Sequence, residues 1–428
     1  MTTGTTAAPR PMVDGTGRPA MALWTLDPST IHLNHGSFGA VPVETAAYQA
    51  ELGREMNGIP GDWFSALPGR LGAARERAAE FLRVAPESAA FVINASAGIS
   101  VVLQSLELRP GAEILVTDHS YGAVTMAAQR AVRRVGGVVR EVPVPLDAAD
   151  DEVVDILTSA FTDGTALLIV DQITSATARV FPIAAIAARS HERGVPVLVD
   201  AAHAPAMLPE PLAGSTADYW VGNLHKWGCT PRGAAVLVAS DAVAQSLYPS
   251  IDSWGHPHPY PTRFDTQGTV DATAQLAAPH ALDLIEREFG WDAARSYMTR
   301  LVEYAETLIV DALEQAWDGP ARVAAASPAP AMRLVGLPDG LVRTPTDAHE
   351  LRDVLALDLG FQTAITSWNG TGYLRLSAHV YNTADDYRAF ADTAVPVIAE
   401  LAHIRSTEPD LTLDETIAQH RTARTATA

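Results

Sequence analysis

The sequence predicts an α/β fold: a large domain with a mostly parallel seven-stranded sheet, followed by a smaller α+β domain. Seven short apolar runs rich in β-branched residues alternate with helix-like stretches between residues 90 and 240, which is the pattern of strands joined by crossover helices. Polar residues follow several of these runs. A long helical pattern then begins near residue 280 and leads into the smaller region.

The expected elements follow one another in a simple order. We expect strands at residues 91–94, 113–118, 138–144, 166–171, 195–200, 219–224 and 234–239, and helices at 281–289 and 292–316. These elements divide the chain into a flexible tail (1–20), a large domain with an N-terminal arm (21–280), a small C-terminal domain (281–405) and a polar tail with a short helix (406–428).

Composition excludes some classes of function. The chain has 50 acidic and 30 basic residues, a formal charge of −20, which argues against nucleic acid as a partner. Cys229 is the single cysteine, so an intramolecular disulfide and a cysteine-based zinc cluster are excluded. The first twenty residues lack the apolar core of a signal peptide, and no run of eighteen apolar residues follows. We expect a cytoplasmic protein without a membrane partner.

Lys226 is the only lysine in the chain, whereas arginine occurs 29 times. Arginine serves for solubility and ion pairing, but a guanidinium stays protonated and cannot condense with an aldehyde, whereas a lysine amine forms a Schiff base. Codon bias that left one lysine by accident is the alternative explanation. The neighbouring motifs favour the explanation that the lysine is kept to form a Schiff base.

Asp200 ends an apolar run, and His203 follows three residues later. Ligands of open α/β sheets bind beyond the carboxyl ends of the strands, and a carboxylate there holds a pyridinium nitrogen protonated. A helix cap is the alternative role for this aspartate. The solitary Lys226, just after the next run, favours the functional interpretation.

Other strand ends carry further candidate groups. Ala95 and Ser96 lie where a strand leads into a helix, and their small size suits a phosphate at the helix N-terminus, although an ordinary capped helix has the same pattern. Tyr121 or His119 has the shape to stack on a planar cofactor, with core packing as the alternative for either. Polar groups suited to a phenolic oxygen follow another strand, at Gln172 and Ser175.

Together, an amine, a carboxylate, a phosphate site and a stacking ring are what pyridoxal 5′-phosphate (PLP) requires. Lys226 would hold PLP through a Schiff base and then act as the base at the substrate Cα, while Asp200 would keep the ring an electron sink. We expect no metal site. His256 and His258 are spaced i and i+2, which favours an exposed or substrate-lining loop over a metal centre.

Six stretches also carry a family resemblance. They are LNHGSFG at 33–39, TDHSYGA at 117–123, DAAHAP at 200–205, GNLHKW at 222–227, GTVD at 268–271 and LRLSAHVYNT at 374–383. Over residues 24–395 the chain resembles fold-type I, class V PLP enzymes, and most closely their isopenicillin N epimerase-like branch, which is related to cysteine desulfurases and C–S lyases.

The resemblance implies roles for individual residues. The groups that it implies for the cofactor are Lys226 for the Schiff base, Asp200 for the pyridinium, His203 beside the ring, and Ala95, Ser96 and His225 at the phosphate. It implies that Thr269 reaches the phosphate of an adjacent subunit, and hence a homodimer with shared active sites. For an amino-acid substrate it implies a carboxylate clamp at Arg375 and an entrance lined by residues 34–39, including Asn34 and His35.

The chain departs from the family pattern at three places. Gln172 stands where a histidine is usual, and Ala178 replaces a common glycine. Desulfurases of the family carry a mobile cysteine before the arginine motif, and residues 360–373 contain none. This disfavours persulfide chemistry, and we expect Cys229 to serve in packing.

The reaction remains open at this point, because one Cα carbanion leads to several outcomes. We favour processing of an S-conjugated cysteine in secondary metabolism such as antibiotic biosynthesis, by β-elimination or by decarboxylative deamination. An epimerase of the isopenicillin N type is the alternative and requires a second proton donor, for which Tyr121, His119 and the loop of His256 and His258 are candidates. A non-catalytic binding protein is disfavoured, because binding alone does not require Lys226.

Overall fold

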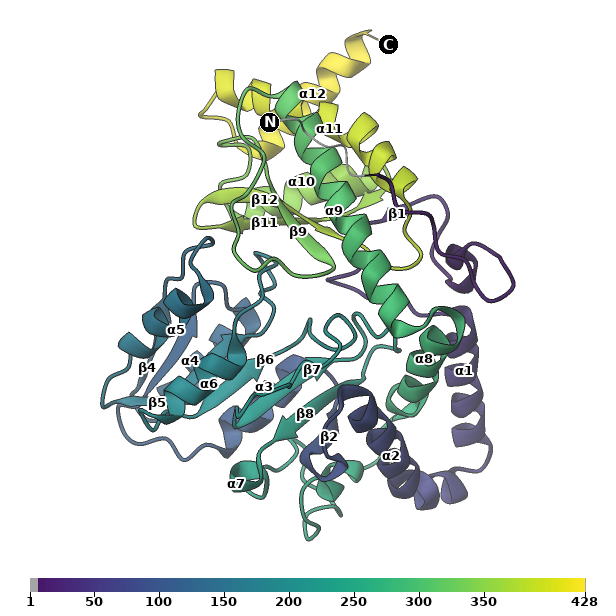
Figure 1. Cartoon of the computed structure of the whole chain (residues 1–428), viewed down its shortest axis with the longest axis vertical. Helices are drawn as coiled ribbons and strands as arrows, with labels where there is room; N and C mark the ends of the chain where they lie inside the picture. Colours follow the sequence, from purple (N-terminus) through teal and green to yellow (C-terminus); the bar gives the residue numbers. More distant parts are fainter. Residues whose placement is uncertain (1–6, 428) are drawn as a thin grey trace. The chain divides into compact units, whose positions relative to one another are not determined.

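The structure is a computed structural model that describes residues 7–427, with side chains up to residue 423. The chain forms two compact units (Figure 1). The large unit comprises Phe38–Ser175 and Arg179–Trp291, and the small unit comprises the described parts of Met1–Ser37, Ala176–Ala178 and Asp292–Ala428. The expected boundary at residue 280 therefore falls inside a helix. Residues 1–6 of the expected N-terminal tail, and residue 428, lie outside the described residues.

The large unit contains a seven-stranded sheet, which confirms the predicted fold class. Its order is β2-β8-β7-β6-β5-β3-β4. The strands are β2 (Ala89–Val92), β3 (Glu113–Thr117), β4 (Val138–Val142), β5 (Thr165–Asp171), β6 (Val197–Asp200), β7 (Tyr219–Asn223) and β8 (Ala235–Ala239). The β3–β4, β3–β5, β5–β6 and β6–β7 pairs are parallel, while β8 runs antiparallel to both of its neighbours.

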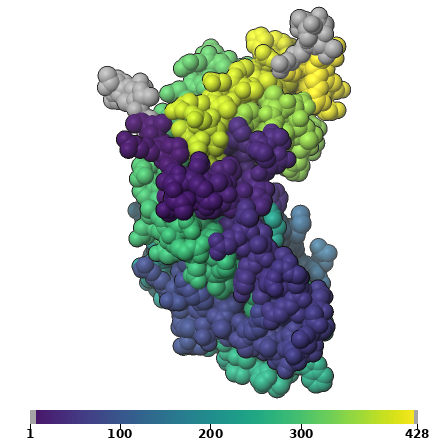
Figure 2. All heavy atoms as spheres, turned by 90° about the vertical axis from the view of Figure 1, so that its right-hand side faces the viewer, coloured from purple at the N-terminus to yellow at the C-terminus, as the bar shows by residue number. Residues whose placement is uncertain are grey.

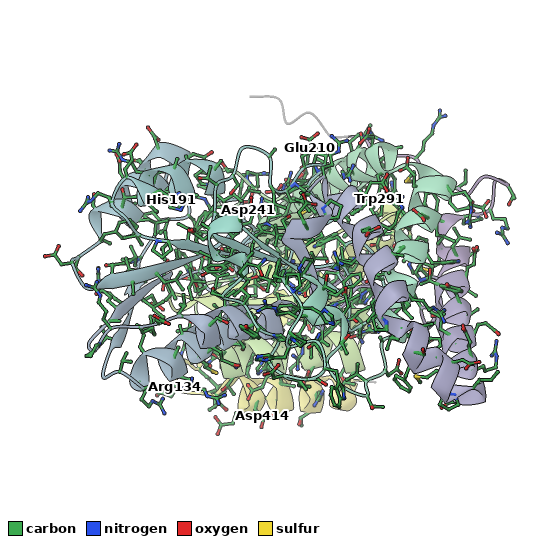
Figure 3. All side chains as sticks on the ribbon, turned by 90° about the horizontal axis from the view of Figure 1, so that it is seen from below. Arg134, His191, Glu210, Asp241, Trp291 and Asp414 are labelled. Atoms are coloured by element: carbon green, nitrogen blue, oxygen red, sulfur yellow. The ribbon has the colours of Figure 1, made fainter. Side chains whose placement is uncertain are left out.

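Helices cover both faces of this sheet. They are α1 (Val43–Gly58), α2 (Pro60–Leu82), α3 (Ala95–Ser105), α4 (Gly122–Arg133), α5 (Asp150–Ser159), α6 (Ile183–His191), α7 (Asp241–Ala244) and α8 (Thr273–Phe289). Figure 3 shows Arg134, which caps α4, and His191, the last residue of α6, on opposite sides of the strands. Because both faces are covered, β6, β7 and β8 are buried along their whole length.

The central strands bring their polar ends to one edge of the sheet. In the parallel β5–β6 pair, Asp171 lies beside Asp200 in register, and each is the last residue of its strand. The neighbouring β7 ends at Asn223, three residues before Lys226. Parallel strands thus collect these side chains where ligands of such sheets bind.

The small unit is built on a three-stranded antiparallel sheet, β11-β12-β9. Its elements are β9 (Met332–Gly336), β11 (Ala364–Trp368), β12 (Thr371–Ser377), α9 (Trp291–Ala316), α10 (Pro345–Leu357), α11 (Ala384–Thr407) and α12 (Leu413–Thr427). N-terminal residues join this unit through β1 (Ile31–His32), which pairs in parallel with β10 (Phe361–Gln362).

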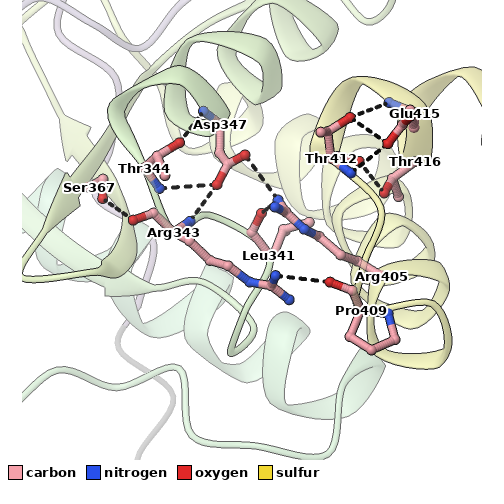
Figure 4. A network of polar contacts seen from close by, with 10 residues as sticks. All are labelled: Leu341, Arg343, Thr344, Asp347, Ser367, Arg405, Pro409, Thr412, Glu415 and Thr416. Atoms are coloured by element: carbon pink, nitrogen blue, oxygen red, sulfur yellow. Dashed lines mark hydrogen bonds and ion pairs between the residues drawn. The ribbon is translucent and has the colours of Figure 1, made fainter.

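The C-terminal segment is helical rather than mostly a polar tail, and a polar network ties it down (Figure 4). The Asp347 carboxylate caps α10 through the backbone N–H of Thr344, and the Thr344 hydroxyl accepts a hydrogen bond in return. From α11, Arg405 reaches Asp347 at 3.2 Å. Arg343 donates to the Pro409 carbonyl at 3.1 Å. None of the helices in the described part of the chain has the length and apolarity needed to cross a membrane.

Candidate active site

Lys226 lies in the turn between β7 and β8, where it meets a histidine from the turn that follows β6. The turn is closed by the backbone N–H of His225, which donates to the Ala234 carbonyl at 3.3 Å. The Lys226 Nζ lies 3.1 Å from the Nε2 of His203. The other ring nitrogen of His203, Nδ1, accepts a hydrogen bond from the indole N–H of Trp227 at 3.4 Å. The amine of the half-buried Lys226 therefore lies against the buried ring of His203.

Two carboxylates lie side by side next to this amine. Asp200 is 4% exposed and accepts a hydrogen bond from the Ala202 N–H at 3.0 Å. Burial raises the pKa of Asp200, against the opposing effect of Lys226. Asp171 is 3% exposed, and burial together with the charge of Asp200 holds its pKa well above the usual range.

Asp171 was not among the residues predicted for the site. The sequence contained a signal for it, because Asp171 ends the strand before Asp200 just as Asp200 ends its own. The sequence around each residue does not show that the two strands are neighbours, or that they pair in this register. The pair of buried carboxylates is a consequence of that pairing.

The N-terminus of α3 is the candidate phosphate site. Asn94 caps the helix, accepting a hydrogen bond from the Ala97 N–H at 2.8 Å, and Ser96 is exposed on the first turn. The Ala95 N–H already donates to the Asn223 side chain at 2.8 Å. Asn223, which the sequence-based selection missed, thus ties this helix to the end of β7.

Gly98 allows α3 to pack closely on the sheet. A Cβ at this position would lie 2.5 Å from Cγ1 of Val221 on β7. Such a contact is too short for any side chain other than hydrogen. The small residues of this helix therefore serve helix-to-strand packing as well as leaving room for an anion.

His225 carries a neutral ring. Its Nδ1 lies 3.1 Å from the Ala234 carbonyl, which can only accept, so the ring donates from Nδ1. Burial and the charge of Lys226 lower the pKa of His225 to about 4. To donate from its second nitrogen to a phosphate, the ring would have to take up a proton.

The two candidates for stacking lie in different surroundings. His119 is 1% exposed, its Nε2 lies 2.7 Å from the Val144 carbonyl, and its ring packs edge-on against Phe181. Burial lowers the pKa of His119. Tyr121, just before α4, is 52% exposed.

The remaining predicted cofactor residues of the large unit are less closely grouped. The Gln172 side chain accepts from the Trp220 indole at 2.8 Å and donates to the Pro211 carbonyl, so both ends of its amide are already used. Ser175 is half-buried at the point where the chain leaves the large unit. Thr269 is exposed in the segment before α8.

The predicted substrate residues belong to the small unit, and there they form a connected group. Arg375 on β12 is 3% exposed and donates to Asn34 at 3.3 Å and to the Ser37 hydroxyl at 2.7 Å. The ring of His35 lies 2.7 Å from the hydroxyl of Tyr381. Ser37 lies in the predicted entrance, residues 34–39, whereas Tyr381 was not among the predicted substrate residues, although it lies inside a quoted motif.

Two other residues weighed from the sequence have simple surroundings. Cys229 is completely buried and has a left-handed backbone (φ 54°). His256 lies 2.8 Å from the carboxylate of Asp252, and both are exposed.

The large unit thus provides, at one edge of one sheet, the groups that PLP needs. An amine lies beside a buried ring, a buried carboxylate ends the adjacent strand, and a capped helix N-terminus begins next to them. PLP supplies an electron-withdrawing pyridinium that stabilises negative charge at the Cα of an attached amine. Fold and site together define a PLP-dependent enzyme of fold type I.

The family follows from comparison with known proteins. A family profile described as Aminotransferase class-V matches residues 68–390, which is most of the chain. The chain belongs to the class-V aminotransferase family. Its relatives include isopenicillin N epimerases, L-cysteine desulfhydrases and cysteine desulfurases.

Two relatives and one solved structure illustrate the similarity. Isopenicillin N epimerase of Amycolatopsis lactamdurans is 30% identical over 390 residues, covering 86% of this chain and 95% of the epimerase. Putative L-cysteine desulfhydrase 1 of Oryza sativa subsp. japonica is 28% identical over 405 residues, covering 86% and 83%. A C-DES mutant with glycine covalently linked to its PLP cofactor superposes with a TM-score of 0.75 at 18% identity, over 89% and 99% of the two chains. This last similarity concerns the fold.

Proposed function

We propose that the protein is a PLP-dependent lyase that releases a thiol from an S-conjugated cysteine in secondary metabolism. The observation that carries this proposal is the contact between Lys226 and His203, which are 3.1 Å apart. It gives the lysine a partner for exchanging the proton that the lysine takes from the substrate and passes to the leaving thiolate. β-Elimination needs one such nitrogen and a good leaving group.

The residues act in a defined order. The Lys226 amine takes the proton from the substrate Cα, and the Asp200 carboxylate stabilises the protonated pyridine nitrogen of the cofactor. The Cβ–S bond then breaks, and the thiolate leaves with the electron pair and takes its proton from the Lys226 ammonium. The remaining 2-aminoacrylate is hydrolysed by water to pyruvate and ammonia, so that atoms and charges balance. Arg375 would bind the substrate carboxylate through its planar fork.

Sulfur leaves in this proposal as a free thiol and is not transferred to the enzyme. A desulfurase that forms a persulfide needs an accessible cysteine thiolate. Cys229 is the only cysteine in the chain, and it is completely buried in a turn. The desulfhydrase relative supports release without a cysteine carrier as the chemistry to test first.

Epimerisation is the second candidate function, supported by the isopenicillin N epimerase relatives. It requires a proton donor on the face opposite Lys226. Within the large unit, His119 is engaged by the Val144 carbonyl and its pKa is lowered by burial, whereas Tyr121 is half-exposed. The Nε2 of His119 also lies 3.6 Å from a carboxylate oxygen of Asp118.

We also propose that the protein acts as a homodimer. The segment that carries Thr269 borders a cavity of about 290 Å³ in the large unit, lined by apolar residues of α2, α3 and α8. Large apolar side chains on this unit are exposed, among them Ile93, Ile251 and Trp254, and α1 and α2 lie open on the surface in Figure 2. Exposed apolar groups of this kind mark interaction surfaces. Sedimentation equilibrium of the PLP-loaded enzyme should give twice the chain mass.

The deciding experiment incubates the PLP-loaded enzyme in deuterated water with cysteine S-conjugates and with free amino acids. Equimolar thiol, pyruvate and ammonia support the lyase. Inverted substrate carrying deuterium at Cα supports the epimerase, and released carbon dioxide supports decarboxylative deamination. Binding without turnover of any substrate would point to a non-catalytic protein.

The matched control is Lys226→Ala, which should abolish both the visible absorbance of bound cofactor and turnover. Borohydride reduction of the wild-type holoenzyme should attach the cofactor irreversibly to one peptide. Because the chain has one lysine, that peptide can only be the one containing Lys226. A wild-type protein that stays colourless after addition of PLP would overturn the cofactor assignment.

A further inference from the structure

The contacts around His203 determine which way its hydrogen bonds point. Trp227 is completely buried, and its indole nitrogen is a donor only. That N–H points to the Nδ1 of His203 at 3.4 Å, so this nitrogen presents a lone pair. A neutral imidazole with an unprotonated Nδ1 carries its proton on Nε2.

The second nitrogen then determines the state of the lysine. Nε2 of His203 lies 3.1 Å from the Nζ of Lys226. If Nε2 donates, Nζ must accept, and only the neutral amine has a lone pair with which to do so. If Lys226 were an ammonium, its N–H groups would face the N–H of His203 Nε2, and two donors would oppose each other. The alternative is that His203 moves its proton to Nδ1, and it then loses the hydrogen bond from the Trp227 indole.

We propose that Trp227 is a positioning residue: by fixing the tautomer of His203, it holds Lys226 as the free amine before cofactor or substrate arrives. The free amine is the form that condenses with an aldehyde and that accepts a proton from Cα. The proposal deepens the proposed function, since it concerns the same lysine. It describes the apoprotein, however, and holds or fails independently of the reaction catalysed.

Charges around the amine act in opposite directions. The Asp200 carboxylate, and Asp171 beside it, favour an ammonium. Burial and the charge of Asp200 raise the pKa of Asp171 well above its usual range, which weakens the attraction of this second carboxyl for an ammonium. The neutral ring of His225 adds no negative charge. The hydrogen-bond direction set by Trp227 therefore opposes the attraction of these carboxyl groups.

The single lysine allows a direct test in the apoprotein. Labelling with 13C,15N-lysine produces one side-chain signal, whose Cε and Nζ shifts distinguish amine from ammonium. We expect the wild-type amine to remain neutral at pH 8, well below the ordinary lysine pKa of about 10.4. In Trp227→Phe the midpoint should rise by about one pH unit, a tenfold change in the proton equilibrium. PLP attachment at pH 7 should slow by a similar factor.

Trp220→Phe is the matched control. Trp220 is equally buried in the same unit, but its indole donates to Gln172, so this substitution should leave the lysine titration unchanged. A second measurement needs no tryptophan variant: in 15N-histidine-labelled wild type, the resonance that disappears in His203→Gln should show the Nε2-protonated tautomer.

Three results would each overturn the proposal: an ammonium signal in the wild type up to pH 9, equal lysine titrations in Trp227→Phe and the wild type, or a His203 ring protonated on Nδ1. Failure of the proposed lyase activity would appear differently. The lysine and histidine signals would then be as expected, while S-conjugated cysteines gave no thiol.

Discussion

Gly39 offers a sharp test of how the lysine is positioned. The residue lies in the large unit, where its backbone passes close to the segment that carries the amine. A Cβ on Gly39 would lie 2.3 Å from the backbone oxygen of Lys226 and 2.4 Å from that of His225. Carbon–oxygen contacts in proteins start at about 3.3 Å, so Gly39→Ala requires a displacement of about 1 Å.

Neither side of this contact yields easily. Backbone hydrogen bonds to Ala234 hold Leu224 and His225, and the Gly39 carbonyl accepts a hydrogen bond from Arg232 at 3.3 Å. A misplacement of about 1 Å lowers turnover by roughly 100-fold, or about 2.7 kcal/mol in the activation free energy. Overpacking should also reduce the free energy of unfolding by about 1–3 kcal/mol.

The assay is single-turnover kinetics of the PLP-loaded variant, with visible absorbance measuring cofactor occupancy and urea denaturation measuring stability. Gly53→Ala in α1 is the matched control, because a Cβ there meets nothing within 4 Å. It should leave the rate unchanged and stabilise the helix by about 0.5–1 kcal/mol. A Gly39→Ala enzyme within threefold of the wild-type rate at full occupancy would refute the reasoning.

Three further predictions concern buried charges. The pKa of Asp171 is raised in the folded state. Above pH 3.8 this residue therefore binds more protons in the native protein than in the unfolded chain. It destabilises the fold as pH rises through the folded pKa. The melting temperature of apo Asp171→Asn, relative to wild type, should therefore increase from pH 4 to pH 8; a constant difference contradicts this. Arg75→Ala breaks an ion pair with Asp265 in which the two side chains are 8% and 3% exposed. Urea denaturation should show that the free energy of unfolding falls by about 3–5 kcal/mol. The control Arg54→Ala, at an exposed position, should change it by about 0.5 kcal/mol or less. Arg375→Ala should raise the KM for amino-acid substrates without changing cofactor absorbance, and an unchanged KM argues against a carboxylate clamp.

The sequence predicted the central sheet well because its strands are buried and apolar, and it erred where the chain leaves the sheet. The expected first strand, 91–94, lies two residues too late, since Asn94 already caps α3 and Ile93 is 59% exposed. Its apolar side chain alone placed Ile93 in the expected strand. At the C-terminus a signal was present but not used: Thr412 and Glu415 form the reciprocal contacts of a capping motif before α12.

Local sequence patterns do not predict how the chain divides into its two units. Residues up to Ser37 group with the C-terminal part, and they do so through the pairing of Ile31 with Phe361. Two two-residue strands separated by about 330 positions leave no periodic pattern. Long-range pairings of this kind follow from the packing of the whole unit and not from the sequence around either strand.

In the site, the chemistry of the side chains was enough to identify the candidate residues. The positions of the protons on those residues depend on neighbouring side chains that have no catalytic chemistry of their own. Lys226, Asp200 and His203 stood out because each has a chemical use at a strand end. Trp227 has no such chemical use, but its indole donates a hydrogen bond to the Nδ1 of His203. That bond nevertheless selects the tautomer of the ring next to the amine.

The position of this proton bears on which reaction follows. In an elimination, the nitrogen that removes the Cα proton can return it to the departing sulfur, so one lysine with one exchange partner suffices. Epimerisation requires a second group, on the opposite face, that is protonated when the lysine is not. If Lys226 is already the free amine in the apoprotein, the second group must carry its proton independently of the lysine. Burial lowers the pKa of His119, which disfavours it as that donor. Tyr121 and the loop of His256 and His258 remain as candidates, and Tyr121 is tested first: an epimerase should lose inversion, but keep deuterium exchange at Cα, when Tyr121 is replaced by Phe.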